Sequence, residues 1–229
     1  MKKAVLIIAT VLAVAAAAIG GLWFGKSLAS APPAAGPPPA SPSAPPAPSS
    51  SPSSGPTVPG PEGCPLAQPV QGDVLKAAPP TQWVRATPRV SLPENAGGPL
   101  RKTDGVGQCF TPDALGALMA AAYHWSYFDA SFPLDVRRRA LEASFQASPD
   151  KNETINSILA VDAQRMTVDG FQFTNSVSGN RAGVLIYFRL EDGTSEPLPT
   201  PLIWTGTTWQ VAMKRATEGT SGPRVDWRA

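Results

Sequence analysis

The sequence predicts an α+β fold in which helices come first along the folded part of the chain and antiparallel strands follow. Two observations support this prediction. From residue 111 to residue 165 apolar side chains recur at helical spacing, and from residue 168 to residue 216 they alternate along short segments separated by turn residues. We expect about three helices packed on one curved antiparallel sheet.

Composition divides the chain of 229 residues further. An apolar N-terminal segment is followed by a low-complexity stretch and then by a proline-containing extension. The predicted parts are a transmembrane anchor or signal peptide at 1–26, a disordered Pro/Ala/Ser-rich stalk at 27–62, an irregular extension at 63–110, and the α+β domain at 111–229. The net charge of +2 is too small to indicate a nucleic-acid partner.

The N-terminal segment has the length of a membrane span. Lys2 and Lys3 precede an uncharged run at residues 4–25, close to the ~20 residues that cross a bilayer as a helix. The small residues at 29–31 also fit a signal-peptide cleavage site, although the apolar core of a signal peptide is usually only roughly 7–15 residues long. Both interpretations place everything after Lys26 outside the cytoplasmic membrane. We expect a single-pass membrane protein with a cytoplasmic N-terminus.

The stalk is composed almost entirely of Pro, Ala, Ser and Gly, which favours an extended spacer with a reach on the order of 100 Å. A ligand for proline-recognising domains is the alternative, but no flanking aromatic or basic residues support it. In the extension that follows, frequent prolines leave room for little beyond a short strand or contact patch at Trp83 and Val84. A disulfide between Cys64 and Cys109 would tie this long loop down; two free thiols are the alternative.

The central helix of the domain is predicted at 111–128. Thr111 is a candidate cap, Pro112 suits the first turn, and Asp113 places a carboxylate near the positive end of the helix dipole. The helix is apolar nearly all round and should be buried. Its apolar stripe consists of Leu115, Leu118, Met119, Ala122 and Trp125, and small alanines occupy the opposite side.

Two shorter helices should follow the central one. The first starts at residues 133–135, with Leu134, Leu141 and Phe145 on its buried side and the arginines at 137–139 mostly facing solvent. The second runs from about Asn152 to Arg165. Its residues at helical spacing are Ile155, Ile158, Leu159 and Asp162.

The remaining segments predict four antiparallel strands. The first lies around residues 168–173, with a bulge at Gly170. The second, at 184–190, is apolar on alternate residues and partly apolar between them, so both of its faces should be at least partly covered. Residues 191–194 give a hairpin turn. Two further strands, at 202–205 and 208–216, should flank a tight turn.

Two stretches resemble a known family. TPDALGALMAAAYHW at 111–125 and LIWTGTTWQVAMKRA at 202–216 are similar to the helix opening and the final hairpin of an uncharacterised extracytoplasmic domain family of actinobacteria. Members of that family typically have an N-terminal anchor and a Pro-rich stalk, and many sit in integrative or conjugative elements. The order of elements resembles the nuclear-transport-factor-2-like fold, and the architecture resembles the bitopic assembly subunits of type IV secretion systems. The turn at 205–208 departs from the family pattern, and the resemblance supplies no catalytic residues.

No catalytic arrangement is predicted from residue spacing. His124 is the only histidine, and Ser126 and Asp129 do not face it as a triad requires, so we expect it to be structural. Tyr123, Asp129 and Asp162 are the polar residues that could line a pocket. One histidine and two distant cysteines make no zinc site, and the glycines at 105 and 107 indicate a turn rather than a dinucleotide motif. We predict no cofactor and no metal.

The function that we expect is a membrane-tethered protein-interaction subunit rather than an enzyme, serving as an accessory or assembly component of a conjugative or mobile-element transfer apparatus. Its partners would be membrane or envelope proteins, with self-association left open. The expected interaction surface comprises Arg137, Arg138, Arg139, Arg189, Gln210 and Lys214. The alternative is a small-ligand-binding domain or enzyme with a pocket between the central helix and the sheet. That pocket would be lined by Tyr123, Trp125, Phe173, Tyr187 and Trp204.

Overall fold

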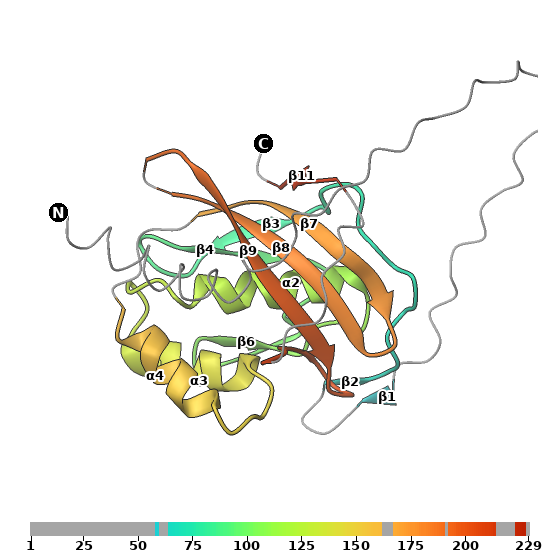
Figure 1. The fold of residues 1–229 in the computed structure, drawn as a ribbon, viewed down its shortest axis with the longest axis horizontal. Helices are drawn as coiled ribbons and strands as arrows, with labels where there is room; N and C mark the ends of the chain where they lie inside the picture. Colours follow the sequence, from blue (N-terminus) through green and yellow to red (C-terminus); the bar gives the residue numbers. More distant parts are fainter. Residues whose placement is uncertain (1–57, 60–63, 162–166, 191, 214–222, 228–229) are drawn as a thin grey trace, which may run out of the picture. The chain divides into compact units, whose positions relative to one another are not determined.

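The α+β prediction is confirmed by the computed structural model, which describes residues 58–59, 64–161, 167–190, 192–213 and 223–227. Within these residues three α-helices precede a five-stranded antiparallel sheet (Figure 1). No helix in this part of the chain is long and apolar enough to cross a membrane. The anchor predicted at 1–26 and nearly all of the predicted stalk lie outside the described residues.

The extension before the central helix is more regular than predicted. The strand expected at Trp83 is present, and it pairs with a second strand in which Pro93 lies opposite Trp83. A proline is tolerated there because a strand of a two-stranded sheet has one open edge. The antiparallel pairs are β1 (Val58–Pro59) with β2 (Pro65–Leu66), β3 (Gln82–Arg85) with β4 (Ser91–Glu94), and β5 (Arg101–Thr103) with β6 (Val106–Gln108).

Helix α2 (Ala114–Ser126) is buried along nearly its whole length, as its apolar composition predicts. Its cap is Asp113 rather than Thr111: Asp113 Oδ1 accepts the backbone N–H of Gly116 at 2.8 Å. Thr111 Oγ1 instead donates to the same carboxylate oxygen at 2.7 Å. Asp73 of the extension accepts another first-turn N–H at 3.0 Å. Two carboxylates therefore stabilise the positive end of α2.

Helix α3 (Leu134–Ser144) starts where predicted, directly after Pro133. Leu141 and Phe145 are buried as expected. Leu134 is not: it is 59% exposed. Its position satisfies the helical spacing, but it is the first residue of the helix, and the buried residues of α3 begin one turn later.

Helix α4 (Lys151–Leu159) is shorter than predicted. Ile155 is buried, and the half-buried Ile158 packs against the core, as the spacing indicates. The predicted continuation to Arg165 includes Asp162, which lies outside the described residues.

The sheet has the order β10-β9-β8-β7-β11, with every neighbouring pair antiparallel. The four predicted strands are present, and a two-residue fifth strand near the C-terminus was not predicted. The early start of the β9 strand was also missed; this part of the strand contains its three prolines. The strands are β7 (Thr167–Ser178), β8 (Arg181–Arg189), β9 (Ser195–Trp204), β10 (Trp209–Val211) and β11 (Val225–Asp226).

Alternation explains how β9 tolerates three prolines. They occupy positions 197, 199 and 201, so their missing N–H groups all fall on one side of the strand. Among the described residues β10 pairs with β9 only from Leu202 to Trp204, so no described strand requires an N–H group from the prolines on that side.

The bulge predicted in the first strand is confirmed, and it controls which side chains face the helix. Asp169 is the extra residue between Val168 and Gly170 in the pairing with β8. The insertion reverses the alternation, so that Val168 and Phe171 both face the core. Gly170 is required for another reason: a Cβ there would lie 2.7 Å from the carbonyl oxygen of Val225, which would push β11 away.

Apolar side chains fill the space between α2 and the sheet. On β8 the residues at 184, 186 and 188 are fully buried, whereas those between them are half-buried or exposed. The sheet therefore has one face on the helices and one face turned away from them. The largest core side chains of this layer are Leu118, Met119, Phe171, Phe173, Ile186, Phe188 and Leu202.

Candidate functional site

Neither of the two cavities described for this part of the chain gathers the five predicted pocket residues. Phe173 and Trp204 are packed in the core. Trp125 is half-buried and donates its indole N–H to Thr200 Oγ1 at 2.7 Å. Tyr187 lies on the face of the sheet that is turned away from the helices, because it alternates with the buried residues of β8. Of the five, only Tyr123 lines a described cavity.

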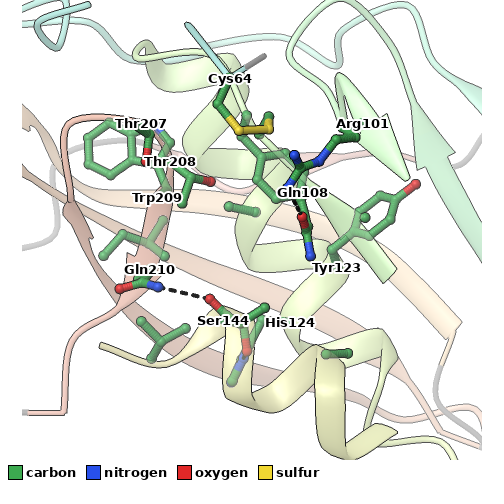
Figure 2. A pocket seen from close by; sticks show the side chains of 18 of the residues that line it. Cys64, Arg101, Gln108, Tyr123, His124, Ser144, Thr207, Thr208, Trp209 and Gln210 are labelled. Carbon is green, nitrogen blue, oxygen red and sulfur yellow. Dashed lines mark hydrogen bonds between the residues drawn. A yellow bond between two sulfur atoms is a disulfide. The ribbon is translucent and has the colours of Figure 1, made fainter. Parts of the chain in front are cut away.

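A cavity of about 250 Å³ lies instead beside the second half of α2, where β6, α3 and β10 meet (Figure 2). Its floor is apolar and includes Leu202, Trp209 and Val211. Polar groups converge on it from four segments of the chain. The polar lining residues are Arg101, Gln108, Tyr123, His124, Tyr127, Ser144, Thr207, Thr208 and Gln210.

The predicted disulfide between Cys64 and Cys109 is confirmed, and it forms part of the cavity wall. The two Cα atoms are 5.2 Å apart although the residues are separated by 45 positions. Cys109 has a φ of 60°, a left-handed conformation that is uncommon for a residue other than glycine. The disulfide fixes the start of the extension to the chain just before α2.

His124 and Ser144 meet at the base of the cavity. His124 Nδ1 lies 2.8 Å from Ser144 Oγ, and the imidazole packs edge-on against the rings of Trp125, Phe128 and Phe145. The side chain is only 2% exposed, and burial lowers the pKa of His124 to about 3. His124 is therefore neutral at physiological pH, in agreement with the structural role predicted for it.

The two neighbours of His124 in the sequence have other partners. Ser126 Oγ donates to the carbonyl of Ala122 at 2.7 Å. Asp129 is buried, accepts the backbone N–H of Ser131 at 2.8 Å, and lies 3.6 Å from Arg89. Within the described residues no carboxylate is hydrogen-bonded to His124, so the histidine–serine pair lacks the third member of a triad.

The remaining polar groups of the cavity are partly committed to the protein. Arg101 Nη2 donates to Gln108 Oε1, and Gln210 Nε2 donates to the carbonyl of Ala143 at 2.9 Å. Thr207 and Thr208 come from the turn between β9 and β10, the segment that departs from the family pattern. This arrangement offers hydrogen-bonding groups to a bound molecule above an apolar floor, which is typical of a binding site.

The predicted arginine surface on α3 is wrong for Arg137, which is only 6% exposed. Its guanidinium donates to the carbonyl oxygens of Tyr127 and Phe128, at 3.4 Å and 3.1 Å. These carbonyls follow the last turn of α2, where a cation is favoured by the helix dipole and by the unpaired carbonyls. Arg138 and Arg139 are exposed as predicted.

The exposed arginines of α3 have local partners. Arg138 donates to Asn156 of α4 at 3.0 Å, and Arg139 forms an ion pair with Asp135 at 2.8 Å. The carboxyl of Asp135 has a lowered pKa because it accepts a hydrogen bond from Arg139. Lys214, the last residue of the predicted surface, lies outside the described residues.

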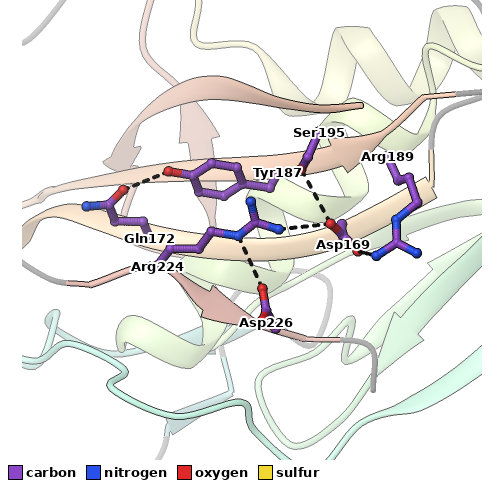
Figure 3. Close-up of polar contacts among 7 residues, drawn as sticks. All are labelled: Asp169, Gln172, Tyr187, Arg189, Ser195, Arg224 and Asp226. Atoms are coloured by element: carbon purple, nitrogen blue, oxygen red, sulfur yellow. Dashed lines mark hydrogen bonds and ion pairs between the residues drawn. The ribbon is translucent and has the colours of Figure 1, made fainter. Parts of the chain in front are cut away.

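Arg189 belongs to a polar cluster on the outer face of the sheet (Figure 3). It contacts Asp169 Oδ1 at 2.5 Å, while Arg224 contacts Asp169 Oδ2 at 2.9 Å and Asp226 at 3.2 Å. The Arg224 guanidinium also lies 4.4 Å from the ring centre of Tyr187. Sequence reasoning missed this cluster because 55 residues separate Asp169 from Arg224. The only local sign of it was the bulge that contains Asp169.

The fold and the cavity define an α+β domain whose N-terminal extension is closed by a disulfide beside a polar-rimmed cavity. A family model described as a domain of unknown function, DUF8175, matches residues 33–226, and the chain belongs to this family. No curated protein and no solved structure matches the chain.

Proposed function

We propose that the chain is a membrane-tethered binding module that works outside the cytoplasmic membrane and recognises a protein of the cell envelope. The observation that carries this proposal is the Cys64–Cys109 disulfide. Disulfides persist in oxidising compartments and are rare in the cytosol. The apolar run at 4–25 supports the membrane tether, because it has the length of a membrane span and is followed by a spacer.

The position of the disulfide suits a tethered domain. Cys64 follows directly after the proline-rich spacer, and Cys109 lies five residues before the start of α2. A cross-link there keeps the point where the spacer enters the domain attached to the core. Tethering then confines the domain near its membrane neighbours and raises its effective concentration for them.

A more specific assignment is a subunit of a conjugative or mobile-element transfer apparatus with a nuclear-transport-factor-2-like fold. Its support is the resemblance of 111–125 and 202–216 to the actinobacterial extracytoplasmic family, together with the order of three helices before a sheet that packs on α2. This assignment depends on resemblance, whereas the tethered binding module depends on the disulfide and the apolar run.

Small-ligand binding is a second candidate function, and the cavity beside α2 favours it. Its volume of about 250 Å³ is near the lower end of the range for small-molecule sites, which begins at roughly 300 Å³. A site of this size suits a compact polar ligand or one side chain of a partner protein. Thr207, on the rim of the cavity, would be close to either kind of bound group.

Site-specific crosslinking in living cells tests the proposal. A photo-crosslinking residue at Thr207, on the cavity rim, is compared with one at the exposed Glu153 of α4, in the full chain. We expect the Thr207 position to yield a discrete adduct with a membrane or envelope protein and the Glu153 position to yield less of it. The proposal fails if neither position captures such a protein. A ligand function is indicated instead if the Thr207 position gains only a small mass.

A further inference from the structure

A second cavity, of about 300 Å³, lies where the two hairpins of the extension meet the second half of α2 and the start of α3. It shares Gly107, Tyr123 and Tyr127 with the lining of the first cavity, but its other lining residues are different. Most of its wall is apolar, and its charged part consists of Arg85 and an ion pair between Glu94 and Lys102. The apolar lining residues include Val84, Leu92, Phe132, Pro133 and Val136.

The hydroxyl of Tyr123 is the unusual group of this cavity. The residue is only 2% exposed, and within the described residues its hydroxyl has no hydrogen-bond partner. The neighbouring Tyr127 is different: its hydroxyl accepts the backbone N–H of Gly107 at 2.8 Å and donates to the carbonyl of Gly105 at 3.0 Å. Buried polar groups in folded proteins are almost always paired, so an unpaired one calls for a partner outside the described residues.

The hydroxyl points away from the first cavity (Figure 2), and Tyr123 also lines the second one. Figure 2 shows the hydroxyl on the far side of the ring from Thr207 and Trp209. Burial raises the pKa of Tyr123, as do the nearby Tyr127 and Glu94, and Glu94 lines the second cavity but not the first. The hydroxyl is therefore protonated at physiological pH and can donate a hydrogen bond.

The ring that carries this hydroxyl is held in place by the chain. A Cβ at Gly107 would lie 2.4 Å from Tyr123 Cε1, so the absence of a side chain at that position lets β6 lie flat against the ring. The other face of the aromatic cluster is closed by Phe110 and Tyr127, with ring centroids 5.6 Å and 6.1 Å from that of Tyr123. A phenylalanine at position 123 would make the same ring contacts, so packing of the ring does not explain why this residue carries a hydroxyl group.

We propose that the second cavity binds a small, uncharged and mostly apolar molecule whose one polar oxygen pairs with the Tyr123 hydroxyl. The apolar walls would hold the body of the ligand. Of the charged lining residues, Glu94 and Lys102 pair with each other, and Arg85 is exposed and donates to the carbonyl of Pro88 at 3.3 Å. This site goes beyond the proposed interaction with an envelope protein and does not depend on it.

The test compares two probes of the same shape, p-cresol and toluene, which differ by one hydroxyl group. Binding to the full chain in detergent is followed by saturation-transfer NMR. We expect p-cresol to bind about 5-fold more tightly than toluene, since one net hydrogen bond contributes about 1 kcal/mol. In Tyr123→Phe the preference for p-cresol should be lost, with binding of toluene unchanged.

Two further variants complete the test. Tyr187→Phe, on the outer face of the sheet, should keep the preference for p-cresol. Val136→Trp, which fills the cavity, should abolish binding of both probes in a protein that still unfolds cooperatively. The inference is overturned if neither probe binds, if Tyr123→Phe keeps the preference, or if Val136→Trp leaves binding unchanged.

Discussion

The guanidinium of Arg137 donates a hydrogen bond to the backbone carbonyl of Phe128 at 3.1 Å, just past the end of α2. A residue that the sequence placed on a solvated face of α3 thereby closes the C-terminal end of the central helix. Its neighbours Arg138 and Arg139 remain exposed, so three consecutive arginines have two different roles.

Replacing Arg137 by alanine should lower the free energy of unfolding by about 2–3 kcal/mol, because buried carbonyls lose a charged donor. Arg138→Ala is the matched control on the same helix and should change it by about 0.5 kcal/mol or less. Urea denaturation of both variants measures the difference. Equal effects of the two substitutions would show that Arg137 does not stabilise the end of α2.

Breaking the Cys64–Cys109 disulfide should destabilise the domain by roughly 3–4 kcal/mol in the chain-entropy model, given the separation of 45 residues. Cys109→Ser should raise amide hydrogen exchange most in the extension and least in β7 and β8. On a non-reducing gel the wild-type chain should migrate faster than its reduced form. Labelling of both thiols in oxidised protein, without reductant, would contradict the account.

Burial of His124 makes stability depend on pH below neutrality. The pKa of His124 is about 3 in the folded protein, and that of a histidine in the unfolded chain is 6.5. Between these two pH values only the unfolded chain takes up the proton. Stability is then complete above pH 6.5 and falls as the pH falls towards 3, by up to about 1.4 kcal/mol per pH unit.

Between pH 5 and pH 6.5 this slope is measured with little contribution from carboxyl groups, whose ordinary pKa values lie near ~4. His124 is the only histidine of the chain, so His124→Gln should flatten the slope in this range even if the variant is less stable throughout. An unchanged slope would mean that His124 is protonated in the folded protein.

Two neighbouring tyrosines should respond in opposite ways to loss of the hydroxyl group. Tyr127→Phe removes two backbone hydrogen bonds and should cost about 1–3 kcal/mol of stability. Tyr123→Phe removes a buried hydroxyl without a partner in the described structure, and should leave stability unchanged or raise it. Thermal unfolding without added ligand measures both. A large loss of stability in Tyr123→Phe would reveal a partner within the chain.

Features that depend on local pattern could be predicted from the sequence. Helical spacing located α2 and the start of α3, alternation located β8, and Gly170 located the bulge. The disulfide followed from there being only 2 cysteines in a segment expected outside the membrane. The residues that predict each helix, strand or bulge lie within that one element, and two cysteines allow only one disulfide pairing.

Features that depend on how elements meet could not be predicted in the same way. Alternation divides β8 into two faces, but only the position of α2 decides that Tyr187 lies on the outer one. The burial of Arg137 depends on where the end of α2 meets α3. The short strand β11 was missed because two residues carry no readable period, and its anchor Asp169 is distant in sequence.

The central claim is that the folded domain is tethered outside the cytoplasmic membrane, and its most direct test is a pair of reporters fused after Ala229 in the full chain. Alkaline phosphatase is active only outside the cytoplasm. Green fluorescent protein fluoresces when it remains in the cytoplasm and stays dark when it is exported in unfolded form. We predict phosphatase activity that sediments with the membrane fraction, together with a dark fluorescent-protein fusion. A fluorescent, phosphatase-inactive chain in the cytosol would contradict the account.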